Sequence, residues 1–420
     1  MPHPDLIRHN AQFPKRVVEL APGFWTATGF AASNVHMIEG RSSVTIIDTT
    51  ESTAAAQNIL AAFRAHCDKP VGRIVYTHSH RDHISGAAVF RDAAQPIYAG
   101  HLFASDLVGV DDARIAPDTA LGRRTQAQFG IGLRPEQRIS LGCGPGDRPM
   151  QGLGAGYIAP TDLIAARQTL DLDGPQAELI LAPGETDDHM VVWLPDHKIL
   201  FSGDNWYHAF PNLYAIRGTP YRDFEAWAKT LGLLAALGAE VLAPGHTRPV
   251  FGAARVHQVL TTTQAAIDHV MRFTADAMDR GLSMDDIAAT ITLPEGLADL
   301  PWLKEFYGKI GWSARAYASG TLGWYDGNPT HLGTLSSTRR AQHLSTLAGG
   351  PRALMTAARG SDDLQWRMEL CDHLIALGEP AQALKAETME ALAELEINAT
   401  ARNSYLFEAK RLRANPEGTT

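Results

Sequence analysis

The sequence predicts an α/β fold in two parts, a β-sandwich that carries the functional site and an α-helical region after it. Short apolar runs rich in β-branched residues, punctuated by Gly and Pro, alternate with amphipathic segments up to about residue 253. Beyond that point apolar residues recur at helical spacing. Polar residues suited to metal binding follow several apolar runs, as in a sandwich with its site on one edge. We therefore expect a site-bearing domain at residues 1–253 and a helical domain at 254–420.

The elements of the first part follow from local composition. Strands are expected at residues 17–20, 24–27, 33–39, 43–48, 72–76, 168–172, 177–182, 190–194, 199–204 and 241–243. An amphipathic helix is expected at 52–67, with Ser52 or Thr53 as its N-cap, and a short helix at 85–90. The Gly- and Pro-rich stretch 116–161 is expected to be a long functional loop or lid, or else a disordered surface insertion.

The turn after the strand at 72–76 holds the densest group of candidate ligands. His78, His80, Asp82 and His83 fall within six residues. Side chains alternate along an extended segment, so His78 and His80 share one face, and a turn can bring Asp82 and His83 nearby. Imidazole nitrogens and carboxylate oxygens suit zinc and similar divalent metals. The density of this group predicts two adjacent metal ions.

Three further candidate ligands also lie where an apolar strand ends. Glu185 follows the strand at 177–182, Asp204 ends the strand at 199–204, and His246 follows the run at 241–243. This recurrence predicts that the three side chains meet the first group at one edge of the sandwich.

Composition excludes several classes of partner. The net charge of −9 argues against a nucleic acid and against an anionic membrane surface. No apolar run approaches 18 residues and no apolar leader is present, which argues against a membrane protein. The three cysteines, Cys67, Cys143 and Cys371, are widely spaced, as in reduced thiols of a cytoplasmic protein.

The second part is expected to be a series of helices that act as a scaffold or a dimer interface. They are predicted at residues 257–280, 284–290, 303–319, 339–347, 349–358, 362–377, 380–396 and 399–411.

The ligand order resembles the metallo-β-lactamase superfamily, an αββα sandwich with a dinuclear metal site. Most members carry His where this chain has Glu185, and a carboxylate there resembles the alkyl and aryl sulfatase branch. Further stretches that resemble this branch are 158–162, 212–218, 322–332 and, in the helical dimerisation region, 398–406. The resemblance covers residues 17–413. It implies a homodimeric hydrolase whose substrates are small alkyl or aryl sulfate esters. It also implies that a metal-bound hydroxide attacks the ester.

The resemblance also implies a role for individual residues. The implied ligands are His78, His80 and Glu185 for one Zn²⁺ or other divalent ion, Asp82, His83 and His246 for the second, and Asp204 shared. Arg217 and Tyr214 join Asp204 as catalytic candidates. Arg217 would hold the sulfate by two parallel hydrogen bonds, with Asn212, Tyr214 and Tyr157 as further substrate-binding residues. Trp324 and Tyr325 are expected to pack the helical region against the site, and Trp312 to line an apolar pocket.

The sequence departs from the branch at three places. Asp204 stands where the family has Glu, Pro211 stands where it has His, and the sterol-carrier-like domain that follows in the family is absent from this sequence. The last difference predicts a preference for compact esters. Alternative functions are phosphoester, organophosphate or sulfamate hydrolysis on the same site, iron-based redox chemistry, and a non-catalytic scaffold.

Overall fold

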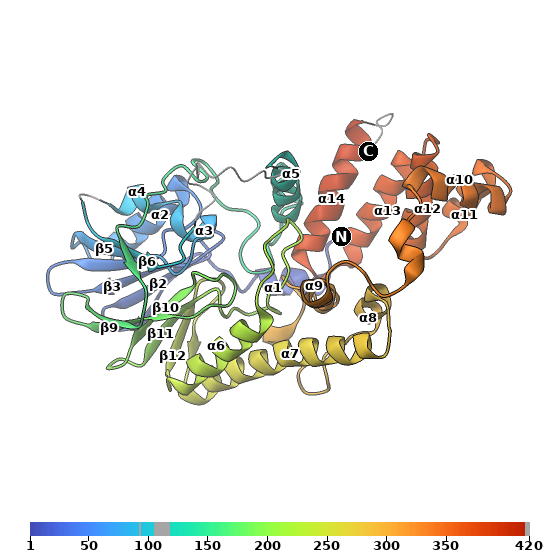
Figure 1. The fold of residues 1–420 in the computed structure, drawn as a ribbon. Helices are drawn as coiled ribbons and strands as arrows, with labels where there is room; N and C mark the ends of the chain where they lie inside the picture. Colours follow the sequence, from blue (N-terminus) through green and yellow to red (C-terminus); the bar gives the residue numbers. More distant parts are fainter. Residues whose placement is uncertain (92–93, 105–117, 416–420) are drawn as a thin grey trace.

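A computed structural model of the chain describes residues 1–91, 94–104 and 118–415 (Figure 1). Its centre is a pair of β-sheets. The first sheet has the order β1-β2-β3-β4-β5-β6-β7, and the second has the order β13-β12-β11-β10-β9-β8. The strands of the first sheet are β1 (Arg16–Ala21), β2 (Phe24–Thr28), β3 (Val35–Glu39), β4 (Val44–Ile47), β5 (Val71–Val75), β6 (Ile97–Gly100) and β7 (Asp162–Ile164). Those of the second are β8 (Gln168–Asp171), β9 (Gln176–Leu181), β10 (Met190–Leu194), β11 (Ile199–Gly203), β12 (Val241–Pro244) and β13 (Val250–Phe251).

Strand direction determines where the candidate ligands gather. In the first sheet β4, β5, β6 and β7 run parallel, whereas β1 to β4 are antiparallel. In the second sheet β11 and β12 form a parallel pair. Parallel strands present their carboxyl ends at one edge, so the turns after β4 and β5 meet, as do those after β11 and β12.

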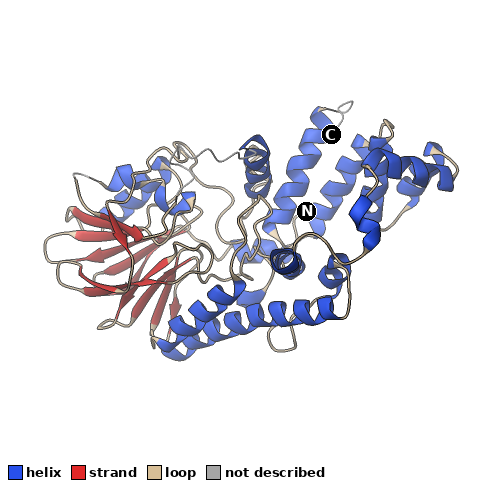
Figure 2. Cartoon of the chain, in the orientation of Figure 1, coloured by secondary structure: helices blue, strands red, loops and turns tan. Residues whose placement is uncertain are grey.

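Helices cover the outer face of each sheet, which gives four layers (Figure 2). Ile47, Val75 and Phe201 belong to the core between the two sheets. Ile59 and Phe63 of α2 (Thr53–Arg64) pack on the first sheet, together with α4 (Ala87–Phe90). On the second sheet lie α6 (Phe224–Ala236) and α7 (Ala253–Asp279). The predicted αββα class is therefore confirmed. The helix expected at 52–67 is α2, and its N-cap is Ser52 as predicted, because the Ser52 hydroxyl accepts a hydrogen bond from Ala55 N.

The remaining described helices form the second part of the molecule, away from the sheets in Figure 1. They are α8 (Met284–Thr290), the 3₁₀ turn Pro301–Leu303, α9 (Ile310–Leu322), the 3₁₀ turn Pro329–Gly333, α10 (Ser337–Ala348), α11 (Pro351–Gly360), α12 (Leu364–Ala376), α13 (Gln382–Leu395) and α14 (Ala399–Ala414). The α-helices match the predicted ones to within a few residues, except that α9 begins at residue 310 and not at 303, and the two 3₁₀ turns were not predicted. The helices α1 (Pro4–Asn10), α3 (Arg81–Ile84) and α6 were not predicted. The domain division at 253/254 coincides with the start of α7 and stays a prediction.

The stretch predicted as a long loop or lid at 116–161 is different in the structure. Positions 116 and 117 lie outside the described residues, but α5 (Asp118–Phe129) is a regular helix that packs on α14. Arg402 Nη1 donates to Gln137 O over 2.6 Å, and Asn403 Nδ2 donates to Ser140 O over 3.3 Å. The loop prediction was wrong for residues 118–129, where packing on α14 and a hydrogen bond from Asn403 Nδ2 to Gln128 O over 3.3 Å stabilise a helix of weak local signal. The described residues 130–161 contain no named helix or strand, as the loop prediction expected. The stretch joins the sandwich to the C-terminal helices.

The expected packing of Trp324 and Tyr325 against the site is also wrong. Trp324 is 70% exposed and contacts Tyr325 edge-on, with ring centroids 5.9 Å apart. The segment between α9 and α10 follows the surface of the helical part, so no core forms there to bury the indole.

Among the residues that the structure describes, no helix is both long and apolar enough to cross a lipid bilayer.

Candidate metal centre

Asp48 organises the turn that carries the first ligand group. It follows β4 directly, and its carboxylate accepts from Thr77 N over 2.8 Å and from Thr77 Oγ1 over 2.9 Å. The same carboxylate lies 2.7 Å from His83 Nδ1. This contact fixes the His83 ring so that its Nε2 faces the centre, the usual role of a carboxylate behind a metal-binding histidine.

Asp204 lies at the centre of the site and contacts ligands from both groups. Its Oδ2 is 3.8 Å from His78 Nε2 and 3.0 Å from His246 Nε2, and its Oδ1 is 3.3 Å from His83 Nε2. His78 Nε2 lies 3.0 Å from His80 Nδ1. Two imidazole nitrogens this close point their lone pairs into one small volume, which is the arrangement that a cation stabilises.

The candidate ligands fall into two clusters. Ligand atoms of His78, His80 and Asp204 all lie within 4.8 Å of one another, and so do those of Asp82, His83 and His246. Asp82 Oδ2 is 3.3 Å from His246 Nε2 and 3.7 Å from His83 Nε2. Six of the seven predicted ligands thus fall into two clusters, with Asp204 beside His78 and His80, whereas Glu185 belongs to neither cluster.

Glu185 lies at the edge of the first cluster. Its Oε1 is 3.7 Å from His80 Nδ1 and 2.8 Å from Arg222 Nη1, with both members of that ion pair buried. Burial raises the pKa of Glu185 to about 7, against the opposing effect of the Arg222 charge. The carboxylate is therefore within reach of a cation at the first cluster, while Arg222 balances its charge.

The donor set fits divalent metal ions. His83 Nε2, Glu185 Oε2 and Asp204 Oδ1 are buried and lack a hydrogen-bond partner among the residues described. Buried polar atoms without a partner are costly, and two of these three, His83 Nε2 and Asp204 Oδ1, lie 3.3 Å apart. Burial lowers the pKa of His78 and His80 well below the usual range, so both rings are neutral and able to bind a metal.

The loop that carries His246 is held by the segment after β2. His246 Nδ1 lies 2.7 Å from Ala32 O, which leaves Nε2 toward Asp204. Asn34 Nδ2 donates to Pro244 O and to Thr247 O, each over 2.9 Å. Asn34 is buried, and its amide therefore fixes the path of the loop on both sides of the ligand.

A buried ion pair between Glu51 and Arg148 holds the same segment through Ala32. Glu51 Oε1 accepts from Ala32 N over 2.9 Å and from Arg148 Nε over 2.6 Å. Arg148 Nη1 also donates to Gly146 O over 3.1 Å. A chain of polar contacts thus leads from the 138–150 region through Glu51 and Ala32 to His246.

The predicted substrate residues lie at different places around the centre. Arg217 Nη2 is 3.5 Å from His80 Nε2, and Arg217 Nη1 donates to Gly218 O, so its guanidinium is at the edge of the metal centre. Asn212 is buried, and its backbone N–H donates to the Tyr207 hydroxyl. Tyr214 lines an adjacent cavity. Tyr157 stacks on Phe103 with ring centroids 6.4 Å apart, and its described contacts lie on the first sheet's helical side.

Sequence reasoning missed Asp48, Asn34, Glu51, Arg148 and Arg222. Asp48 had a usable signal, because it is an acid at the end of an apolar strand, as Asp204 is. The others had none, since a buried role for an Asn, Glu or Arg is visible only once its neighbours are known.

Four layers with a buried cluster of His and carboxylate side chains at the strand ends define a metallo-β-lactamase-type sandwich. The sequence pattern of that superfamily matches residues 28–246, and the pattern described as alkyl sulfatase dimerisation matches residues 283–415. The chain belongs to the metallo-β-lactamase superfamily and, within it, to the alkylsulfatases, which are metal-dependent sulfuric ester hydrolases.

Named relatives support this membership. The chain is 33% identical over 396 residues to a linear primary-alkylsulfatase of Pseudomonas sp., covering 91% of this chain and 74% of the relative. It is 30% identical to an alkyl/aryl-sulfatase of Saccharomyces cerevisiae, over 94% of this chain and 63% of that protein. The solved structure of a stereoselective inverting sec-alkylsulfatase from Pseudomonas sp. superposes with a TM-score of 0.88 at 29% identity, over 98% of this chain and 67% of that one.

Proposed function

We propose that this protein hydrolyses sulfate monoesters at a dinuclear metal centre. The observation that carries the proposal is the position of Asp204, whose two oxygens face ligands of both clusters at 3.0 to 3.8 Å. A carboxylate between two such clusters is suited to bridge two cations. The named activities of the relatives support a sulfate ester as the substrate.

The proposed ligands keep the predicted assignment. His78, His80 and Glu185 would hold one cation, Asp82, His83 and His246 the other, and Asp204 would bridge them. Nitrogen and oxygen donors without thiolate favour zinc or a similar divalent ion. When bound, two such cations would lower the pKa of a water molecule held between them and so provide a nucleophile near neutral pH.

The protein's own residues would bind and orient the ester. Arg217 offers a planar guanidinium at the edge of the first cluster, where it would pair with the anionic sulfate. Asn212 and Tyr214 come from the same segment and would add hydrogen bonds to the ester. Tyr157 remains a weaker proposal because its described contacts are with Phe103.

The reaction class can be tested directly with the metal-loaded enzyme. Sulfate, phosphate and sulfamate esters of the same alcohol would be incubated in oxygen-18 water, and both products analysed by mass. We expect turnover of the sulfate ester above the other two, with one oxygen-18 atom in either the sulfate or the alcohol. Faster turnover of the phosphate or sulfamate ester would replace the proposal by that alternative hydrolase.

We also propose that the chain is a homodimer built through its helical part. The dimerisation pattern at 283–415 supports this, and so do exposed apolar side chains in the same region. They are Leu322, Trp324, Leu332, Leu335 and Leu347. Exposed apolar groups of this size are typical of an interface. The boundary at 253/254 falls between the two family patterns, which supports the proposed division into two domains.

A further inference from the structure

Arg217 lies on a turn outside regular secondary structure. Gly218 N donates to Ala215 O over 2.9 Å and closes the turn, so the backbone N–H of Arg217, a central residue of the turn, needs another acceptor. Within the described part of the chain the guanidinium donates to Gly218 O, lies 3.5 Å from His80 Nε2 and forms no ion pair with a carboxylate. The position of the guanidinium therefore depends on what holds this turn.

The acceptor for the Arg217 N–H is a side chain of α5. Arg217 N donates to Gln128 Oε1 over 2.9 Å, and Gln128 is only 1% exposed. Its Nε2 is also buried and has no hydrogen-bond partner among the described residues. A buried amide with one unpaired polar atom costs free energy, which a leucine of similar size would avoid. The contribution of this amide to the structure is therefore its bond to the Arg217 backbone.

The end of α5 that carries Gln128 is held by α14. Gln128 O lies in the last turn of α5, where carbonyls have no donor within the helix, and Asn403 Nδ2 donates to it over 3.3 Å. In the segment that follows, Lys410 Nζ donates to Gly132 O over 2.6 Å. Gly130 lies between these two points with a φ of 63°, and a Cβ there would be 3.3 Å from Asn403 Cγ. The end of α5 is therefore fixed against α14.

A continuous path of contacts joins α14 to the edge of the metal centre, and Figure 1 shows α5 and α14 side by side. The path leads from Asn403 to the Gln128 backbone, from the Gln128 side chain to the Arg217 backbone, and from the guanidinium to His80. The α14 helix belongs to the region that matches the dimerisation pattern, residues 283–415. The helical part thus reaches the group that is proposed to hold the sulfate.

We propose that Gln128 is a positioning residue for Arg217, and that α14 holds Gln128 in place through Asn403. The helical part then sets the affinity of the metal centre for the sulfate group, in addition to its proposed role in the dimer. This inference rests on the proposed function for the role of Arg217. A guanidinium that is held in one orientation loses less conformational entropy when it binds an anion than a mobile one does.

The test measures the dissociation constant of inorganic sulfate by calorimetry on the full-length, metal-loaded protein. Sulfate has the charged oxygens of the ester group, and its binding requires no turnover. Gln128→Leu keeps the approximate size of the side chain but removes the acceptor of the Arg217 N–H. We expect about fivefold weaker sulfate binding, which corresponds to one neutral hydrogen bond, and an unchanged metal content by elemental analysis.

The same substitution in an Arg217→Ala background separates positioning from a general loss of structure. If Gln128 acts through Arg217, the double variant binds sulfate as weakly as Arg217→Ala alone, whereas independent effects multiply. Asn403→Leu and Lys410→Met loosen α5 from α14, the second at an exposed position. Each should weaken sulfate binding about twofold or more, and neither should weaken it further in the Arg217→Ala background.

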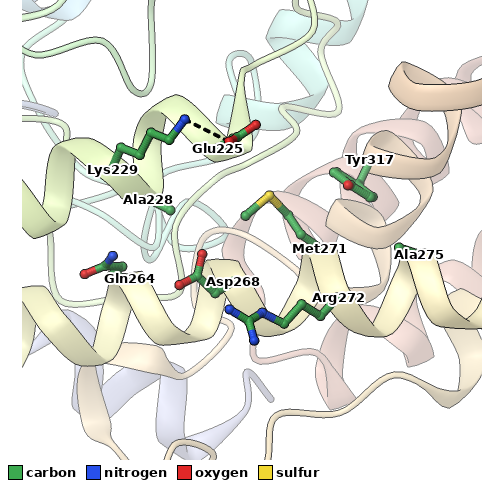
Figure 3. Close-up of a pocket in the computed structure, with 9 residues that line it drawn as sticks. All are labelled: Glu225, Ala228, Lys229, Gln264, Asp268, Met271, Arg272, Ala275 and Tyr317. Atoms are coloured by element: carbon green, nitrogen blue, oxygen red, sulfur yellow. Dashed lines mark ion pairs between the residues drawn. The ribbon is translucent and has the colours of Figure 1, made fainter.

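A second glutamine provides a matched control (Figure 3). Gln264 of α7 lines a cavity of about 370 Å³ between α6, α7 and α9, where its amide lies against Gly232. None of the described residues that line this cavity belongs to the metal centre or to the path from α14 to Arg217. Gln264→Leu is the same change on another helix and should leave the affinity for sulfate unchanged.

Wild-type sulfate affinity in Gln128→Leu, or a loss that multiplies with that of Arg217→Ala, would overturn the inference. An equal loss in Gln264→Leu would do the same. Wild-type affinity in Lys410→Met and in Asn403→Leu would overturn the role of α14, and Lys410→Met alone decides this point if Asn403→Leu does not fold.

The proposed function is judged separately, by turnover of a sulfate ester. A protein in which the Gln128 and Arg217 variants are coupled in sulfate binding, but which cleaves no sulfate ester, would keep the inference and lose the activity. Turnover of the ester together with uncoupled variants would keep the activity alone.

Discussion

Arg222 Nη1 lies 2.8 Å from Glu185 Oε1, and the two side chains are only 3% and 2% exposed. A buried ion pair becomes costly when one partner is removed, because the remaining charge is left uncompensated. Glu185 also occupies the position at which most members of the superfamily have a histidine. The pair therefore links the stability of the fold to the charge of the metal centre.

Arg222→Met should destabilise the metal-free protein by about 3–5 kcal/mol in the free energy of unfolding. Added divalent metal should restore part of this loss, because a cation near Glu185 replaces the charge of the guanidinium. Denaturant titration with and without metal measures both effects. Arg315→Met is the control, since its pair with Asp285 is exposed and should contribute less than about 1 kcal/mol. Equal effects of the two variants would contradict the prediction.

Asp204→Asn should lower both metal content and turnover. The amide keeps the shape of the side chain but lacks the charge that would bridge two cations. We expect fewer than two metal ions per chain by elemental analysis, and a loss of kcat of about a hundredfold or more, the range found for removal of a group that stabilises developing charge. Asp196→Asn, on the exposed turn between β10 and β11, should change neither quantity. Full metal content in Asp204→Asn would show that this carboxylate is not a bridge.

Arg217→Ala should weaken sulfate ester binding and leave metal content unchanged. Loss of a charged hydrogen bond of about 1.5–3 kcal/mol corresponds to a roughly tenfold to hundredfold rise in KM. Arg217→Lys should recover only part of this loss, because an ammonium group cannot make two parallel hydrogen bonds. Steady-state kinetics on one sulfate ester test both variants. Unchanged kinetics in Arg217→Ala would remove Arg217 from the substrate site.

His9 should make the fold sensitive to acid. Its ring stacks on Phe306 with centroids 3.9 Å apart, its Nε2 lies 2.6 Å from Gly142 O, and burial lowers its pKa to about 4. As the pH falls, the His9 ring therefore binds a proton in the unfolded chain at a higher pH than it does in the folded protein. Stability is fully present above about pH 6.5 and falls as pH drops toward 4, by about 3 kcal/mol in total.

His9→Phe provides the matched measurement for this effect. The variant keeps an aromatic ring against Phe306 but cannot bind the proton. Its free energy of unfolding, measured in denaturant at several pH values, should fall less steeply between pH 6.5 and 4 than that of the wild type. Parallel pH profiles would assign the acid sensitivity to other groups.

The combined variant Trp324→Asp with Leu332→Asp should yield monomers. The two side chains are 70% and 64% exposed, so the change should not disturb the core. The molar mass from light scattering should be twice the chain mass of 45.5 kDa for the wild type and equal to the chain mass for the variant. Leu163→Asp, at an exposed position on β7 of the sandwich, should remain dimeric. A dimeric double variant would place the interface elsewhere.

Much of the site was predictable because its signals are local. His78 and His80 lie two residues apart in the turn directly after β5, and Glu185, Asp204 and His246 each follow an apolar run. Helices such as α8 and α14 were found from periodicity alone. By contrast, α5 was read as a loop because its sequence has a weak apolar stripe, and contacts with α14 stabilise it.

The sequence by itself therefore determined the two-part α/β architecture, the order of the candidate ligands and the family. Only the tertiary structure decided what surrounds those ligands. Arg222 beside Glu185, Asp48 behind His83 and Asn34 on the His246 loop are each distant in sequence from the residue they contact. Periodicity and motifs describe neighbours along the chain, whereas buried charge compensation depends on which strands pair, and that is determined by the fold as a whole.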